Sequence, residues 1–195
     1  MHSAARNENP EVIVTLIEAG GDINARTAGF WEATPLHEAA QFNENPAVIN
    51  ALLAAGANIN AKGDFGDTPL HKAACNENPE VFAALLDAGA DINARDNFGG
   101  TPLHKAAQFN KNPAIIPALL AAGADLTART KLNRHTPLHV AAKNSETPAV
   151  ITALLDAGAN PKAKDRKGNT PWNYAENNEA LKNSGPYWRL NDLRF

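Results

Sequence analysis

The chain has 195 residues, of which 44% are hydrophobic and 20% charged, and its formal net charge is −3 with a pI near 6.1. A mildly acidic balance argues against nucleic acid as the main partner, because nucleic-acid binding normally needs a strongly basic face. No run of 18 apolar residues occurs, so the sequence predicts no membrane-spanning helix. The lone cysteine, Cys75, excludes an internal disulfide.

The chain begins inside a motif that recurs further on. Met1–Ala5 aligns with the later Leu-His-x-Ala-Ala segments but lacks the Thr-Pro pair that precedes them. We therefore expect a first repeat cut from a longer protein. A missing signal peptide then says nothing about export. The expected location is cytoplasmic.

One motif repeats along the rest of the chain. It reads TPLHEAA at Thr34, TPLHKAA at Thr68 and Thr101, TPLHVAA at Thr136 and TPWNYAE at Thr170, at spacings of 34, 33, 35 and 34 residues. The end of each repeat recurs too, as AGGDINA, AGANINA, AGADINA, AGADLTA and AGANPKA. A fixed period of this length predicts stacked repeats that pack on their neighbours.

These motifs closely resemble the ankyrin repeat family over almost the whole chain. The resemblance implies an all-α solenoid of stacked helix–turn–helix repeats with β-hairpin connectors. We expect a single domain, residues 1–195. It comprises a truncated repeat 1–33, full repeats 34–67, 68–100, 101–135 and 136–169, and a C-terminal cap 170–195.

Each repeat is predicted to form two helices. The first begins at Thr-Pro, where threonine caps the helix and proline suits its first position. The second begins at an Asn-Pro or Thr-Pro pair and carries apolar residues at i, i+1, i+4 and i+5 on one face. These pairs are Asn9-Pro10, Asn45-Pro46, Asn78-Pro79, Asn112-Pro113 and Thr147-Pro148. It should end at a left-handed glycine, at Gly20, Gly56, Gly89, Gly123 and Gly158. Pro117 should cost one backbone hydrogen bond.

The last repeat departs from the pattern, because Trp172, Asn173 and Tyr174 replace Leu-His-x. Terminal repeats need a polar outer face. We therefore expect the tail to fold back over the end of the stack, burying Tyr187, Trp188 and Leu190.

The histidines of the first helices, His37, His71, His104 and His139, form a column. Packed helices lie about 8–10 Å apart, whereas zinc needs ligand nitrogens about 2.0–2.1 Å from one ion. No metal or cofactor is expected, and the resemblance implies that these rings hydrogen-bond the backbone between repeats. Cys75 lies four residues after His71, yet no third residue orients this pair, which favours an inert thiol over a nucleophile. The prediction is no enzyme activity.

The connectors between repeats carry the candidate site. Lys62–Asp67, Arg95–Gly100 and Lys164–Asn169 span six residues, whereas Arg26–Ala33 and Arg129–His135 are longer. Each begins with a basic residue, and apolar residues lie near the tips. The family resemblance places them beside the first-helix ends on a concave groove. The candidate partner-binding residues are Arg26, Phe30, Trp31, Lys62, Phe65, Arg95, Phe98, Arg129, Leu132, Phe42 and Phe109.

Arginine and aromatic residues often dominate interface energetics, and a row of positive charge attracts acidic segments. Ordinary packing between connectors is the competing interpretation, and Asp64, Asp96 and Asp165 could neutralise part of the row. We predict a monomeric, non-enzymatic module that binds a protein or peptide of acidic and apolar character, without nucleic acid or a membrane span. The alternative is the non-catalytic targeting portion of a larger enzyme or effector whose active domain is absent from this chain.

Overall fold

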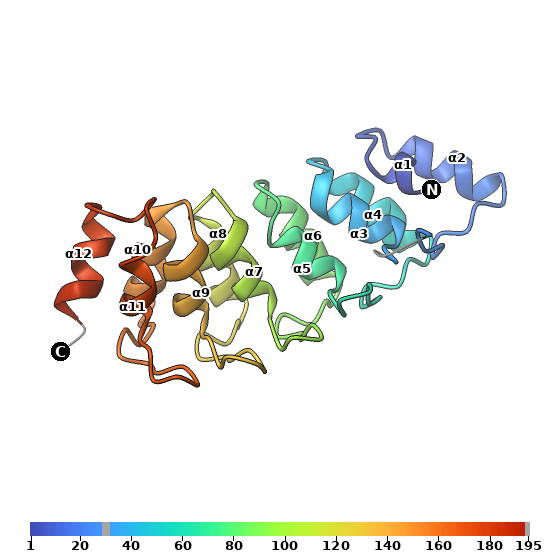
Figure 1. The fold of residues 1–195 in the computed structure, drawn as a ribbon. Helices are drawn as coiled ribbons and strands as arrows, with labels where there is room; N and C mark the ends of the chain where they lie inside the picture. The colour runs from blue at the N-terminus through green and yellow to red at the C-terminus, as the bar shows by residue number, and fades with distance from the viewer. Residues whose placement is uncertain (29–31, 194–195) are drawn as a thin grey trace. The chain divides into compact units, whose positions relative to one another are not determined.

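The computed structural model describes residues 1–28 and 32–193, so Phe30 and Trp31 of the candidate site lie outside the described residues. The described chain consists of helices and loops and contains no β-strand (Figure 1). It divides into two compact halves, Met1–Asn97 and Phe98–Phe195, which are described separately below.

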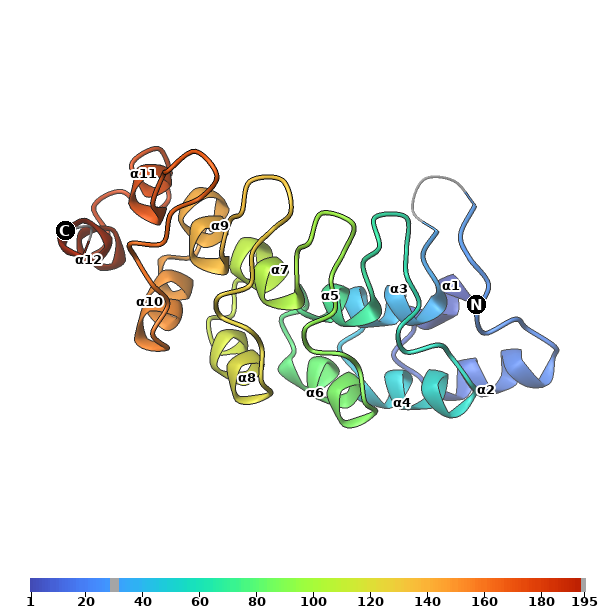
Figure 2. The same cartoon turned by 90° about the horizontal axis from the view of Figure 1, so that it is seen from below.

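The N-terminal half stacks three helix pairs. Its helices are α1 (His2–Ala5), α2 (Glu11–Glu18), α3 (Pro35–Phe42), α4 (Pro46–Ala54), α5 (Pro69–Ala73) and α6 (Pro79–Asp87). The first helices of the repeats, α1, α3 and α5, pack side by side in one layer, and the second helices α2, α4 and α6 form the other (Figure 2). The connectors extend beyond the layer of first helices, away from the second helices.

The C-terminal half has the same two layers. Its helices are α7 (Pro102–Phe109), α8 (Ile115–Ala121), α9 (Pro137–Asn144), α10 (Pro148–Asp156), α11 (Pro171–Ala175) and α12 (Gly185–Asp192). Here α7, α9 and α11 form the layer of first helices, while α8, α10 and α12 form the second layer. The predicted all-α repeat solenoid is confirmed.

The core lies between the two layers. In α3 the leucine and paired alanines of the motif, Leu36, Ala39 and Ala40, are fully buried. In α4 the predicted apolar stripe buries Val48, Ile49 and Leu52 completely. The later repeats follow the same pattern, because a period near 3.6 residues brings these positions to one helix face. In the first repeat α2 buries only Ile13.

The predicted helix ends are largely confirmed. Gly20, Gly56, Gly89, Gly123 and Gly158 all adopt positive φ values of 81–89°. Asn45 accepts the Ala47 N–H at 2.9 Å as a helix cap. Thr147 is an exception, since its side chain does not cap α10; instead Ser145 Oγ accepts the Thr147 N–H at 3.2 Å. Helix α8 departs from the predicted start at Pro113 and begins at Ile115, because Pro117 has no N–H to donate to the Pro113 carbonyl.

Asparagine side chains connect successive repeats at the turn between first and second helices, which the sequence interpretation missed. Asn43 is buried, and its Nδ2 donates to the carbonyls of Ala5 and Asn7 at 3.1 and 2.9 Å. Its Oδ1 accepts the Asn45 N–H at 2.8 Å. Asn76 bonds the preceding repeat in the same way, as does Asn178 in the C-terminal half.

The tail folds back as predicted, but Trp188 is not its buried anchor. Helix α12 packs on α10 and α11, with Leu190 1% exposed. Trp188 is 50% exposed, whereas Trp172 at the start of α11 is 6% exposed. Within α12, the position of Trp188 two residues before Leu190 turns it away from the face that buries the leucine.

Candidate partner-binding surface

In the four repeats that begin with Thr-Pro-Leu-His, a histidine fixes the start of the first helix. His37 Nδ1 accepts the backbone N–H of Thr34 at 3.2 Å, and its Nε2 lies 3.1 Å from the carbonyl oxygen of Asp67 in the next connector. His139 makes the equivalent bonds to Thr136 and Asn169. Because Nδ1 accepts, Nε2 carries the proton and donates to the carbonyl. The expected hydrogen bonds between repeats are thus confirmed for these two histidines.

Burial keeps these rings neutral. It lowers the pKa of His37 and His139 below the ordinary value of 6.5. Burial also lowers the pKa of His135, although the Asp165 carboxylate lies 3.5 Å away. A second proton at Nδ1 of His37 would remove the bond from Thr34, so protonation and the helix start are incompatible.

The free energy of unfolding is therefore expected to fall as the pH is lowered below 7. The unfolded chain takes up protons near pH 6.5 while the folded chain resists them until its lower pKa values are reached, so acid favours unfolding. Each histidine contributes up to about 1.4 kcal/mol per pH unit within that window. Urea titrations at several pH values and constant ionic strength measure the slope.

The last repeat suggests a control variant for the pH dependence of the free energy of unfolding. In the last repeat Asn173 replaces the histidine, and its Oδ1 accepts the Thr170 N–H at 2.8 Å. His37→Asn should therefore keep the helix start yet reduce the dependence on pH. An unchanged slope in this variant would contradict the assignment.

Neighbouring connectors are joined by single backbone hydrogen bonds. In the N-terminal half the Asn97 N–H donates to the Phe65 carbonyl at 2.8 Å. In the C-terminal half the Lys131 N–H donates to the Phe98 carbonyl at 2.8 Å. In the connectors that the structure describes in full, the expected β-hairpins are hairpin-shaped turns without assigned strands, since six or seven residues leave few groups to pair across each turn.

Glycine permits this close approach. Gly99 has φ +78°, and a Cβ there would lie 2.9 Å from the backbone nitrogen of Lys131. Gly168 has a similar φ of +84° but no atom within 4 Å of the corresponding position. The left-handed conformation is thus common to both turns, while the next connector crowds Gly99 and also Gly66, where a Cβ would lie 3.0 Å from the backbone nitrogen of Asn97.

Members of the basic row have partners within the chain. Arg26 pairs with Glu32 at 2.6 Å. Arg129 Nη1 donates to the carbonyls of Arg134 and Lys164 at 3.0 and 2.7 Å, so it links two connectors. Lys62 and Arg95 are exposed. Arg129 therefore has an architectural role that its place in the sequence pattern does not reveal.

The predicted apolar residues within the described chain are all exposed. On the connectors, Phe65, Phe98 and Leu132 are 43%, 57% and 68% exposed. At the ends of first helices α3 and α7, Phe42 and Phe109 are 50% and 56% exposed. These five side chains lie where a partner approaching the connectors or the first-helix ends would meet them.

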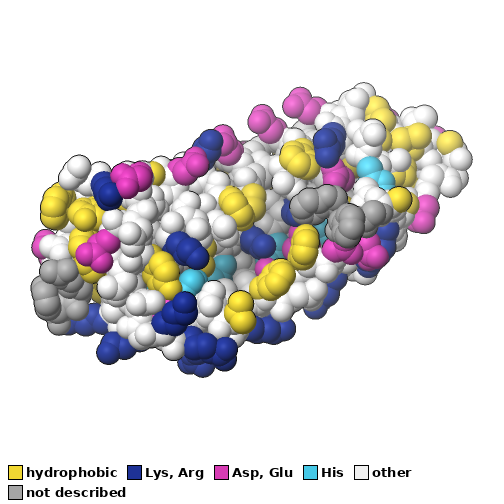
Figure 3. All heavy atoms as spheres, viewed as in Figure 1, with side chains coloured by type: hydrophobic (Ala, Val, Ile, Leu, Met, Phe, Trp, Pro, Cys, Tyr) yellow, Lys and Arg dark blue, Asp and Glu magenta, His cyan; other side chains and the backbone are white. Residues whose placement is uncertain are grey.

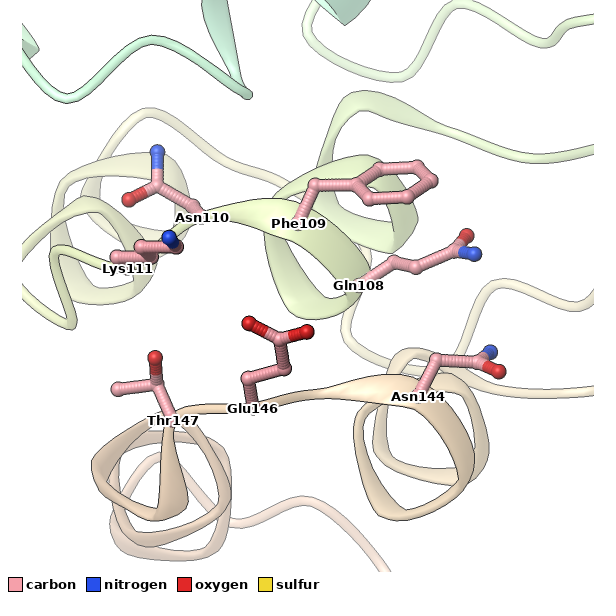
Figure 4. A pocket seen from close by; sticks show the side chains of 7 residues that line it. All are labelled: Gln108, Phe109, Asn110, Lys111, Asn144, Glu146 and Thr147. Atoms are coloured by element: carbon pink, nitrogen blue, oxygen red, sulfur yellow. The ribbon is translucent and has the colours of Figure 1, made fainter. Parts of the chain in front are cut away.

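The two first-helix ends differ in their surroundings. The guanidinium of Arg6 lies 4.3 Å from the centre of the Phe42 ring and pairs with Glu38 at 2.6 Å. Phe109 borders a surface hollow that continues over the turn to α10, lined by Gln108, Phe109, Asn110, Lys111, Asn144, Glu146 and Thr147 (Figure 4). Phe109 is the one aromatic side chain among the residues that line this hollow.

A polar cluster that sequence reasoning missed supports the last two connectors. Tyr174 donates its hydroxyl to Asp165 Oδ2 at 2.6 Å, and its oxygen lies 3.1 Å from His135 Nε2. Burial alone would raise the Asp165 pKa, but hydrogen bonds from Tyr174, Asn169 and Lys167 lower it to about 2. The aspartate is therefore ionised and satisfied inside the protein.

Cys75 is half-buried, and its thiol lies 3.6 Å from the backbone carbonyl oxygen of His71. The ring nitrogen Nδ1 of His71 accepts the Thr68 N–H at 3.1 Å. In the described residues, no three His, Cys, Asp or Glu side chains are grouped to hold a metal ion.

Residues 1–28 and 32–193 include no helix with the length and apolar character needed to cross a membrane. The family model for ankyrin repeats (three copies) matches residues 1–96, 36–130 and 103–183. No curated protein matches the chain. Ankyrin repeats are generally protein–protein interaction modules and are typically not catalytic. With matches over nearly its whole length and helix pairs that follow the motif, the chain belongs to the ankyrin repeat family.

Proposed function

We propose that this protein is a non-enzymatic interaction module that captures a protein segment on its connectors and first-helix ends. One observation carries the proposal. Of the eight large apolar side chains that are exposed in the described residues, five lie on connectors or first-helix ends: Phe42 and Phe65 in the N-terminal half, and Phe98, Phe109 and Leu132 in the C-terminal half. Exposed aromatic side chains gathered on one kind of surface element are typical of binding sites.

The surface is also preformed, which favours binding. Histidines fix the starts of the first helices, and backbone hydrogen bonds join neighbouring connectors. Binding therefore costs little conformational entropy on this side of the complex, because the main chain is already held in place.

Photo-crosslinking from defined positions tests the proposal. A photoreactive phenylalanine analogue would replace Phe65, Phe98 or Phe109 in turn. The matched control is Val14, which is 44% exposed on α2 in the layer of second helices. We expect one partner to be crosslinked from the first set and not from Val14. Crosslinks from Val14 alone would move the interface to the second helices.

A further inference from the structure

Charge is divided unequally between the two halves of the chain. Met1–Asn97 has 5 basic and 14 acidic residues, a formal charge of −9. Phe98–Phe195 has 13 basic and 7 acidic residues, a formal charge of +6. The net charge of −3 hides this contrast.

The positive charge of the C-terminal half is concentrated on its connectors. Arg129–His135 and Lys164–Asn169 together hold six basic residues, namely Arg129, Lys131, Arg134, Lys164, Arg166 and Lys167. Their one acidic residue, Asp165, has a side chain only 1% exposed and bonded to Tyr174. By contrast, Lys62–Asp67 in the N-terminal half has one basic and two acidic residues. We call the six residues, with Leu132, the basic connector surface.

Hydrogen bonds bring these connectors together. The Arg166 N–H donates to the Asn133 carbonyl at 2.9 Å, and Arg129 reaches the Lys164 carbonyl. Lys and Arg side chains gather over the connectors at the lower edge of the molecule in Figure 3. In the described residues, 1–28 and 32–193, no ion pair is formed by Arg134, Lys164, Arg166 or Lys167. Leu132, the most exposed large apolar residue described, lies among them.

We infer that the basic connector surface binds a short acidic protein segment that packs an apolar side chain against Leu132. The inference rests on the proposed function and names its partner class. The positive charge of Arg134, Lys164, Arg166 and Lys167 attracts carboxylates over about 8 Å in physiological salt, and Leu132 supplies the apolar contact that charge alone lacks.

A short protein segment fits this surface better than nucleic acid. The positive charge is concentrated on two connectors, because the rest of the C-terminal half has 7 basic and 6 acidic residues. A long polyanion would extend beyond so local a surface and lose attraction there. The central apolar residue is also aliphatic, whereas single-stranded nucleic acid is usually stacked on aromatic rings.

The test uses the full chain and fluorescence anisotropy. The probes are a labelled peptide of Asp, Glu and Leu, the same peptide with Ser for Leu, and a single-stranded oligonucleotide of equal length. Arg166→Glu with Lys167→Glu removes charge from the surface. Its matched control is Lys182→Glu with Arg189→Glu, which alters the net charge equally in the same half but off the connectors and outside the residues that line the hollow beside Phe109. Leu132→Ser removes the apolar contact.

We expect the Leu peptide to bind best, with affinity lowered about tenfold or more by the Arg166/Lys167 variant and little by its control. Leu132→Ser should weaken the Leu peptide but not the Ser peptide. Equal loss in both charge variants, or tighter oligonucleotide binding lost in the Arg166/Lys167 variant, would overturn the inference. So would self-association at low salt abolished by that variant, because a second copy would then be the occupant. If the peptides fail while Phe65 and Phe109 still crosslink a partner, the inference falls and the proposed function stands.

Discussion

Trp172→Ala is expected to lower the free energy of unfolding by about 3–5 kcal/mol, the cost of removing a large buried aromatic side chain. Trp172 is 6% exposed, and its ring lies 4.8 Å from that of Tyr187 in α12. The substitution therefore opens a cavity between α11 and the helix that covers it. Urea or thermal unfolding followed by circular dichroism measures the loss.

Trp188→Ala is the matched control for Trp172→Ala. The same residue type is removed sixteen positions away, but Trp188 is 50% exposed. We expect its loss to cost less than about 1 kcal/mol, close to the range of ordinary surface substitutions. Equal destabilisation by both variants would contradict the packing of α12 described above.

Asn43→Ala is expected to cost about 2–4 kcal/mol, because it leaves buried carbonyl groups without their donor. The side chain makes two hydrogen bonds to the preceding repeat and one within its own turn. Hydrogen exchange should show the loss as faster opening of α1 together with the turn around Asn43, in addition to a lower unfolding midpoint.

Two further variants separate the contributions of Asn43. Asn43→Ser copies Ser145, whose Oγ accepts the local N–H of Thr147, so it should restore the turn but not the bonds between repeats. Asn50→Ala, at an exposed position on α4, should change stability by no more than about 0.5 kcal/mol. If Asn43→Ser matched the wild type, the bonds to Ala5 and Asn7 would contribute nothing measurable.

The helices were predictable because their signals are local. A Thr-Pro pair marks the start of a first helix, and a glycine at positive φ marks the end of a second helix. The sequence of a single repeat is therefore enough to predict where its helices begin and end. Trp188 was misplaced for the opposite reason. Its burial depends on which face of α12 meets α10 and α11, and a repeat pattern gives no information on a segment that does not repeat.

Much of the candidate surface also depended on long-range contacts. The sequence pattern identified Phe65, Phe98 and Leu132 as tip residues, and each is exposed. It could not reveal that Arg129 bonds carbonyls of two connectors, or that Asp165 is buried beneath Tyr174. The regular spacing of asparagines two residues before each Asn-Pro pair was a signal available for the bonds of Asn43 and Asn76.

The direction of those asparagine bonds bears on how such an array changes length during evolution. Asn43 and Asn76 each donate to the repeat before them, so the turn of one repeat is completed by its successor. A duplication or deletion of one whole period restores every donor to an equivalent set of carbonyls, wherever in the period the breakpoints fall. Insertions within a connector also keep these bonds, because Asn43 and Asn76 reach equivalent carbonyls 36 and 33 residues earlier. Selection on this turn therefore preserves the turn itself, while connector length and copy number are free to vary.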